Sequence, residues 1–271
     1  MKIKNLFLPI FFSTVLLILF FSSCKKDADP LADLPEKFTK KVLIEEFTGE
    51  WCPACSGAFP RIQDVLDDHP NTVFAAALHI NDPFKADGNY EIKTTFSVSS
   101  FPSCMVDRFS FGESSPRTYP STSIMTNRSN LRLEEKVNTG LKIETEIASD
   151  KANIKVFVGQ NKIISGDPRL TVYLIEDEVP QVNQAGTSDP NYKHHAVVRQ
   201  ILTEAKGSPI NLKSQERDFH TYSYEGVDIS NFNKNHLKVI AFVHYFDQSD
   251  LSNHEIINVQ QVTLGKNKDW D

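Results

Sequence analysis

The chain contains little cysteine and no excess of positive charge. Four cysteines in 271 residues are too few for a scaffold held together by many disulfides. Acidic residues (35) outnumber basic ones (29), and the net charge of -6 argues against a nucleic-acid-binding surface. The sequence has no internal repeat and no low-complexity tract. With 40% hydrophobic and 24% charged residues, the composition excludes a disordered chain, a collagen-like chain and a multi-span membrane protein.

The longest apolar run, from Leu6 to Phe21, lies near the N-terminus and follows Lys2 and Lys4. It is shorter than the roughly 20 apolar residues that cross a bilayer. A positive segment followed by such a run is typical of a secretory signal. We therefore expect the mature chain to lie outside the cytoplasm, where disulfides can persist.

Small residues followed by Cys24 end this run and resemble the lipobox of bacterial lipoproteins. The resemblance implies that residues 1–23 are a signal peptide and that Cys24 carries a lipid that attaches the protein to a membrane. Residues 24–37 are polar and bounded by proline, which predicts a flexible tether. A cleaved signal with an unmodified cysteine, or a short N-terminal anchor, is the alternative.

The residue pattern of the mature chain changes near residue 137. Before it, apolar runs alternate with segments of helical spacing, which predicts a βαβ unit and an α/β layer. After it, apolar and polar residues alternate along about seven segments, which predicts an all-β sandwich. We expect one domain over residues 38–137 and a second over 138–271.

The expected secondary structure follows from the same patterns. In the first domain the expected strands are 42–47, 73–80 and 103–107, and the expected helices are 52–68, 89–98 and 121–136. In the second domain the expected strands are 141–147, 154–158, 170–174, 196–204, 218–224, 236–246 and 256–264. A long polar loop, 178–193, interrupts the second set.

The segment Cys52-Pro53-Ala54-Cys55 follows the first expected strand and opens a helix. A cysteine at a helix N-terminus meets free N–H groups and the positive end of the helix dipole, and both favour the thiolate. Cys55 lies one turn further along, and Pro53 fits the first turn because its missing N–H is harmless there. This arrangement suits thiol–disulfide exchange, with an exposed nucleophile and a shielded resolving thiol. Half of a zinc site and a fixed structural disulfide are the alternatives.

The residues around this motif resemble the active-site segment of thioredoxin-fold proteins. Trp51 directly precedes Cys52, and Pro60 matches the family's helix-kinking proline. Glu46 lies six residues before the first cysteine, where the family keeps a buried acid. Phe101-Pro102 lies where the family has a cis-proline that faces the disulfide. The resemblance therefore implies an α/β thioredoxin-like fold for the first domain.

The resemblance also implies roles for these residues. Cys52 is the nucleophile, Cys55 is the resolving thiol and disulfide partner, and Glu46 exchanges a proton with Cys55. Burial would raise the pKa of Glu46 towards neutrality. Strand alternation allows only one of Glu45 and Glu46 to face the site, and the alternative is that both are surface charges. No organic cofactor and no metal ion is required. The residues expected to contact substrate are Trp51, Pro53, Phe101 and Pro102.

Two other features allow more than one interpretation. Cys104 is expected to be a buried strand residue, since free cysteine is among the most buried residue types. The alternatives are a third redox partner, or a metal site with Cys52, Cys55 and His79. His194-His195 begins an expected strand, so its two rings should point to opposite faces as packed or surface histidines rather than act as a pair.

The layout as a whole resembles the twenty-eight-kilodalton outer membrane protein family of Bacteroidetes lipoproteins. The lipobox, residues 42–49 with Cys-Pro-x-Cys, Phe101-Pro102-Ser103, and segments 170–177 and 194–199 carry this resemblance. It implies an outer membrane lipoprotein that faces the periplasm or the cell surface. The function of that family is poorly defined, so the resemblance indicates architecture more than activity.

Two functions fit the sequence. One is a membrane-tethered thiol–disulfide oxidoreductase, whose partners are protein or small-molecule disulfides and thiols. The other is a non-catalytic binding or structural lipoprotein, whose β-domain holds a protein or glycan ligand and whose disulfide staples a loop. The presence of Trp51, Glu46 and Pro102 favours the enzyme, because a staple needs none of them.

Overall fold

The computed structural model describes most of the chain from residue 31 onward. The predicted signal peptide and eight of the fourteen residues of the predicted tether, including Cys24, lie outside the described residues. Within the described part, no helix is both long enough and apolar enough to cross a membrane. The described residues are 31, 33–180, 183–212, 214–250 and 252–270.

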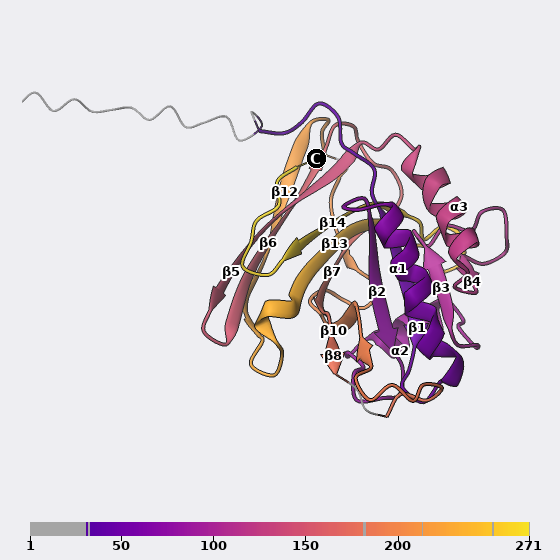
Figure 1. Cartoon of the computed structure of the whole chain (residues 1–271). Coiled ribbons are helices and arrows are strands. Elements are labelled where there is room, and N and C mark those ends of the chain that lie inside the picture. Colours follow the sequence, from indigo (N-terminus) through magenta and orange to yellow (C-terminus); the bar gives the residue numbers. More distant parts are fainter. Residues whose placement is uncertain (1–30, 32, 181–182, 213, 251, 271) are drawn as a thin grey trace, which may run out of the picture.

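The first half of the chain contains every strand and helix expected there, with ends shifted by a few residues (Figure 1). The expected helix 52–68 starts as a 3-10 turn and becomes α-helical at Ala58. The elements are β1 (Val42–Thr48), η1 (Pro53–Gly57), α1 (Ala58–Asp68), β2 (Val73–His79), α2 (Asn89–Thr95), β3 (Ser103–Val106), β4 (Arg117–Thr118) and α3 (Thr122–Leu133).

The second half is almost entirely β-structure, as its alternating pattern predicts. The long polar loop contributes two short strands that pair with each other, β8 and β9. The elements are β5 (Thr139–Ala148), β6 (Lys151–Gln160), β7 (Pro168–Glu176), β8 (Val179–Pro180), β9 (Lys193–His194), β10 (Val197–Ile201), β11 (Ser208–Pro209), β12 (Asp218–Asp228), η2 (Lys234–His236), β13 (Leu237–Tyr245) and β14 (Ile256–Thr263).

One sheet runs through both halves of the chain. In the described residues its strand order is β14-β13-β7-β10-β2-β1-β3-β4, with β11 paired to β7. The halves meet where β10 lies parallel to β2, and the Ala77 N–H donates to the Ala196 carbonyl at 2.7 Å. The domain division at residue 137 stays a prediction, and the structure adds that the two segments share a sheet.

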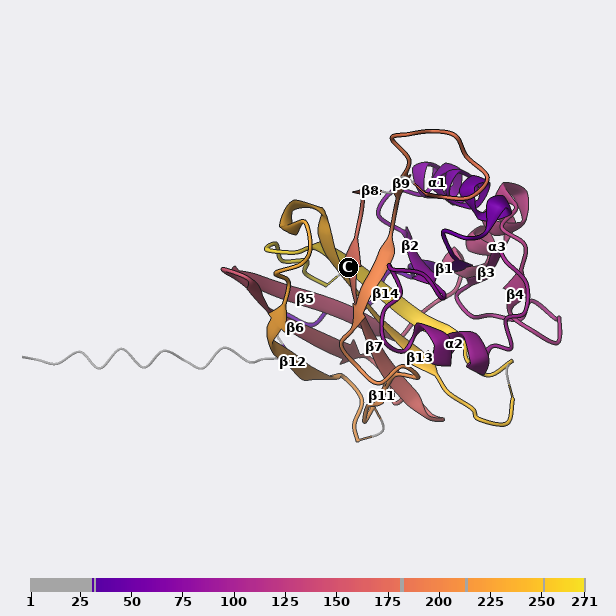
Figure 2. The same ribbon diagram turned by 90° about the horizontal axis from the view of Figure 1, so that it is seen from below.

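Strands β7 and β13 separate two hydrophobic cores. Tyr173 and Ile175 of β7 face the core that holds β1, β2 and the helices. Leu170, Val172 and Leu174 alternate with them and face the three-stranded sheet β12-β6-β5, which lies away from α1 and α3 (Figures 1 and 2). The protein is therefore a mixed α/β structure, mostly β, in which a small sheet packs on one part of the long shared sheet.

Candidate functional site

The two cysteines of the Cys-Pro-Ala-Cys motif form a disulfide in the turn that follows β1. Their Cα atoms are 5.3 Å apart. Backbone hydrogen bonds shape the turn: Cys52 N–H donates to the Gly49 carbonyl at 3.0 Å, and Cys55 N–H donates to the Cys52 carbonyl at 3.1 Å. Pro53 occupies the first turn of η1, where its missing N–H leaves no donor unpaired. The disulfide pairing expected from the resemblance is confirmed.

Trp51 and the Phe101–Pro102 peptide lie on one side of this turn. The indole is 46% exposed, and its Nε1 donates to the Ile80 carbonyl at 2.7 Å. Its ring meets the Phe101 ring edge-on, with centroids 5.1 Å apart. The Phe101–Pro102 bond is cis, as the resemblance implies. A polar groove of about 300 Å³ begins at Pro102, and its lining includes Ser100, Ser103, Thr118 and Tyr119.

Glu46 is buried in β1, six residues before Cys52. Its side chain is held away from solvent, and burial raises its pKa to about 8, against a smaller opposing effect of a hydrogen bond with Thr48. One carboxylate oxygen, Oε1, has no hydrogen-bond partner. Glu46 pairs across the sheet with Cys104, and burial followed by the charge of Glu46 raises the pKa of the Cys104 thiol. Glu46 is thus an acid that stays protonated near neutral pH.

The raised pKa of Glu46 predicts a pH-dependent stability. Between pH 4.5 and about 8 the folded carboxyl holds a proton that the unfolded chain has released. The free energy of unfolding should therefore fall as pH rises through this window, by at most about 1.4 kcal/mol per pH unit. Urea unfolding of the wild type and Glu46→Gln from pH 5 to 9 should show that the advantage of the variant grows with pH. The exposed Glu146→Gln is the control and should leave the curve unchanged; a Glu46→Gln curve parallel to the wild type would contradict the assignment.

Glu45 points to the opposite face of β1 and is also fully buried. Its two oxygens accept from Arg108 Nε at 2.6 Å and Arg108 Nη2 at 2.8 Å. Tyr173 of β7 donates its hydroxyl to Glu45 at 3.0 Å. The alternative in which both glutamates are surface charges is therefore wrong: Glu46 pairs across the sheet with Cys104, and Glu45 forms a buried ion pair with Arg108 and accepts a hydrogen bond from Tyr173 in the second half of the chain.

The remaining sequence candidates are packed side chains. Cys104 is free and fully buried, as expected. His194 packs edge-on against His79 at 4.6 Å, whereas His195 stacks on Phe59 at 5.1 Å, so the two rings face different neighbours. His79 Nδ1 lies 2.6 Å from Asp82 Oδ2, which also accepts from the Glu50 N–H at 3.0 Å.

The geometry does not support a metal site formed by the cysteines and His79. Cys52 and Cys55 are bonded to each other, and one nitrogen of His79 is engaged by Asp82. Across the described ranges no cluster of three His, Cys, Asp or Glu side chains is arranged to hold a metal ion.

A segment that the sequence did not point to covers the disulfide. Gln184–Gly186, which we name the cover segment, lies between β8 and β9 and reaches the N-terminal end of α1 (Figure 2). The Ala185 N–H donates to the Glu50 carbonyl at 2.8 Å, and Gln184 Nε2 donates to the Cys52 carbonyl at 3.0 Å. The sequence feature that could have pointed to the cover segment is the long loop 178–193, which contains a glycine, because loops of this length are often functional.

The cover segment changes one expectation about the nucleophile. The sequence predicts an exposed Cys52, but the residue is only 4% exposed and Cys55 only 3%. The reason is tertiary: a loop more than 130 positions away in the sequence packs on the turn, and its carbonyl at Gly186 accepts from Ser56 Oγ at 3.4 Å. A second departure is that the motif opens a short 3-10 turn rather than a long helix.

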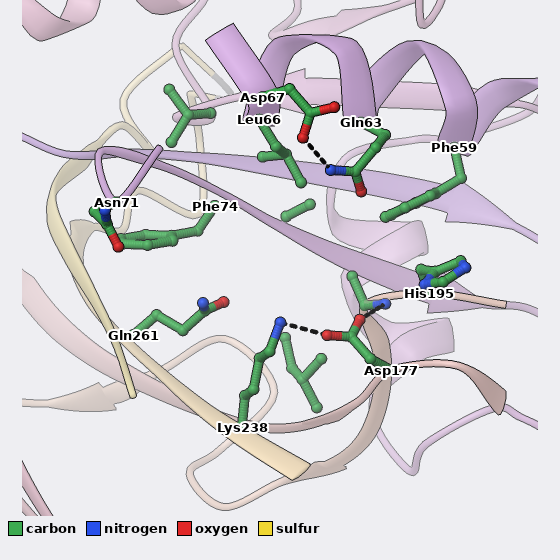
Figure 3. Close-up of a pocket in the computed structure, with 14 residues that line it drawn as sticks. Phe59, Gln63, Leu66, Asp67, Asn71, Phe74, Asp177, His195, Lys238 and Gln261 are labelled. Atoms are coloured by element: carbon green, nitrogen blue, oxygen red, sulfur yellow. Dashed lines mark hydrogen bonds and ion pairs between the residues drawn. The ribbon is translucent and has the colours of Figure 1, made fainter. Parts of the chain in front are cut away.

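A second groove, of about 230 Å³, lies between α1 and the shared sheet, away from the disulfide (Figure 3). Phe59 and Leu66 of α1 form its apolar side with Phe74 of β2. On the opposite side Lys238 forms an ion pair with Asp177, whose carboxylate also accepts from the Ala196 N–H at 2.8 Å. No residue of the cysteine motif lines this groove.

Comparisons with known proteins found a matching family and similar solved structures. A family model described as outer membrane protein Omp28 matches residues 89–268. HBP35 of Porphyromonas gingivalis has a similar solved structure, with a TM-score of 0.74 and 25% identity over 84% of this chain and 76% of that chain. A protein of Agrobacterium tumefaciens shares the fold at 12% identity, with a TM-score of 0.58 over 86% of this chain and 98% of that chain. No curated protein matches the chain.

Proposed function

The chain belongs to the Omp28 family of outer membrane proteins, and we propose that it acts there as a thiol–disulfide oxidoreductase. The family accounts for the outer membrane localisation. Lipidation of Cys24 and a tether over residues 24–37 are part of the proposal. So is a thioredoxin-like arrangement of residues 38–137 followed by a β-sandwich, which the parallel pairing of β1 with β2 and the antiparallel pairing of β1 with β3 support.

The observation that carries the proposal is the position of the disulfide. It lies in the turn after β1, directly beyond the half-exposed Trp51, whose ring touches Phe101 of the cis Phe101–Pro102 peptide. A disulfide that only fixed a loop would not need an exposed indole and a cis-proline beside it. The buried acid on the preceding strand, Glu46, supplies a proton donor near neutral pH.

The proposed exchange begins when a substrate thiolate attacks Sγ of Cys52. The Cys52–Cys55 bond breaks, Cys55 leaves as a thiolate, and Glu46 gives it a proton. A second substrate thiolate then attacks the mixed disulfide on its substrate sulfur and releases Cys52. Two substrate thiols become one disulfide while the cysteine pair becomes a dithiol, and the reverse sequence reduces a substrate disulfide. The direction in the cell depends on the reduction potential of the pair.

The reduction potential is the test of this function. We expect the Cys52–Cys55 pair to titrate between about -120 and -270 mV, the range of known exchange catalysts. Trp51 fluorescence in glutathione or dithiothreitol redox buffers reports the equilibrium, in a Trp270→Phe background that removes the other indole. Cys52→Ser and Cys55→Ser are the controls and should abolish the transition. A potential below about -300 mV, typical of structural disulfides, would contradict the proposal.

A second candidate function is a non-catalytic binding protein. The observation that favours it is the burial of both cysteines beneath the cover segment. Ligand binding would then use the groove beside α1, whose aromatic side chains and polar rim suit a peptide or a glycan. A non-catalytic binding protein would have a reduction potential below about -300 mV, the value that would contradict the exchange function.

A further inference from the structure

We propose that the cover segment, Gln184–Gly186, selects the substrates of the Cys52–Cys55 disulfide: small thiols and disulfides reach it, whereas those of folded proteins are excluded. This inference rests on the proposed exchange function and adds its substrate class. It is carried by contacts between the second half of the chain and the disulfide turn.

The cover segment occupies the backbone carbonyl of the nucleophile and the carbonyl two residues before it. Ala185 N–H donates to the carbonyl of Glu50, and the Gln184 side chain donates to the carbonyl of Cys52. An extended polypeptide that approached from this side would need such acceptors for its own N–H groups. Because the protein's own chain already uses them, this face of the disulfide is closed to a partner.

The fit of the segment depends on glycine at position 186. Gly186 has φ +84°, a conformation that disfavours residues with a side chain. A Cβ there would collide with the Pro53 carbonyl oxygen and lie 2.7 Å from Pro53 Cα. The base of the loop is closed by the pairing of β8 with β9 and by an ion pair between Lys193 and Glu178 at 2.7 Å. The segment is therefore held in close contact with the cysteine turn.

The remaining approach lies on the side of the disulfide turn that the cover segment leaves open. It runs past the exposed ring of Trp51 and the Phe101–Pro102 peptide, where the adjoining groove has a volume of about 300 Å³. A groove of this size accepts a small molecule or a few side chains. A folded protein needs about 800 Å² of contact on each partner for a stable complex. The cover segment therefore gives small thiols and disulfides access to Cys52 and excludes those of folded proteins.

The exchange step itself needs no further reactant. A thiolate attacks Sγ of Cys52, a new S–S bond forms as the Cys52–Cys55 bond breaks, and Cys55 leaves with the electron pair. With a small thiol this step proceeds beneath the cover segment. With a protein thiol it proceeds only from the fraction of molecules in which the segment is displaced, so the rate scales with that fraction.

The test compares two reductants on the oxidised, full-length mature protein. Dithiothreitol is the small thiol and a reduced thioredoxin is the protein thiol. Samples are quenched with acid and alkylated, and reduced protein is counted by mass. In Gly186→Ala the collision with Pro53 displaces the segment, and losing its hydrogen bonds should raise the thioredoxin rate by about tenfold or more. The dithiothreitol rate should change by less than about twofold.

Two further variants provide a control and a second test. Gly226→Ala has a similar backbone strain, at φ +65°, but no atom lies within 4 Å of the added Cβ, so neither rate should change. Gln184→Ala removes the side-chain hydrogen bonds to the carbonyls of Cys52 and Ala185 without a collision and should raise the thioredoxin rate by a smaller factor. Unchanged thioredoxin rates in both cover variants, or equal increases with both reductants, would overturn the inference. A wild-type disulfide that dithiothreitol cannot reduce would instead refute the exchange function itself, and the substrate class with it.

Discussion

Replacing Arg108 by methionine is expected to lower the free energy of unfolding by about 3 to 5 kcal/mol, because it leaves the carboxylate of Glu45 buried without its counter-charge. Arg108 follows β3 and is almost fully buried, with two hydrogen bonds to Glu45 at 2.6 and 2.8 Å. Its guanidinium also lies 5.1 Å and 5.0 Å from the ring centroids of Phe96 and Phe242. Burial alone would lower the pKa of Arg108, but the charge and hydrogen bonds of Glu45 together with Tyr173 outweigh it and raise that pKa, so Arg108 stays charged.

Residues of the second half of the chain contact this ion pair. Glu45 belongs to β1, whereas Tyr173 of β7 donates to Glu45 at 3.0 Å and accepts from Arg108 at 3.2 Å. His244 of β13 contacts the same guanidinium, and burial, followed by the charge of Arg108, lowers its pKa. Loss of Arg108 should therefore destabilise both halves together in one cooperative transition.

Urea unfolding of a double-mutant cycle measures this effect. Arg108→Met should be strongly destabilised, and Glu45→Leu/Arg108→Met should recover much of the loss, because buried ion pairs exchange for apolar residues at little cost. Lys193→Met, which breaks an exposed ion pair with Glu178, is the matched control and should change stability by less than about 1 kcal/mol. A small effect of Arg108→Met, similar to that of Lys193→Met, would show that solvent reaches the pair.

Replacing Cys24 by serine is expected to remove the mature form of the protein from the membrane fraction. The proposed lipid on Cys24 would supply about 0.8 kcal/mol of membrane affinity for each buried methylene, and stable attachment takes two such signals. In the part of the chain that the structure describes, no helix offers a substitute anchor. The wild type should pellet with membranes, and the variant should be soluble or remain as an uncleaved precursor.

Cell fractionation with intact-mass analysis separates these outcomes, because mass distinguishes mature protein from precursor. Cys52→Ser is the control, since it removes a different cysteine and should leave membrane attachment intact. Incorporation of labelled palmitate into the wild type and Cys52→Ser, but not into Cys24→Ser, provides a second readout. Mature Cys24→Ser protein that still pellets with membranes after a high-salt wash would show that the lipobox assignment is wrong.

Local patterns in the sequence determined most of the secondary structure and part of the site. Alternating apolar residues predicted β5, β6 and β7, because one face of each strand is buried and residue spacing along a strand has a period of two. The spacing of Cys52 and Cys55 allowed a disulfide within one turn. Glu46 and Pro102 were identified through the resemblance to thioredoxin-fold proteins, Glu46 by its place six residues before Cys52 and Pro102 by its place after an expected helix and before an expected strand.

Only the tertiary structure decided which distant segments meet. The parallel pairing of β10 with β2, the burial of Glu45 against Arg108 and Tyr173, and the contact of Gly186 with Pro53 join residues that are far apart in the sequence. Residue periodicity shows which face of a strand is buried, but it does not identify the partner that buries it. Which surfaces pack together depends on their shapes and hydrogen-bonding groups in the folded chain. No local sequence pattern therefore predicted that Gln184–Gly186 would cover the disulfide.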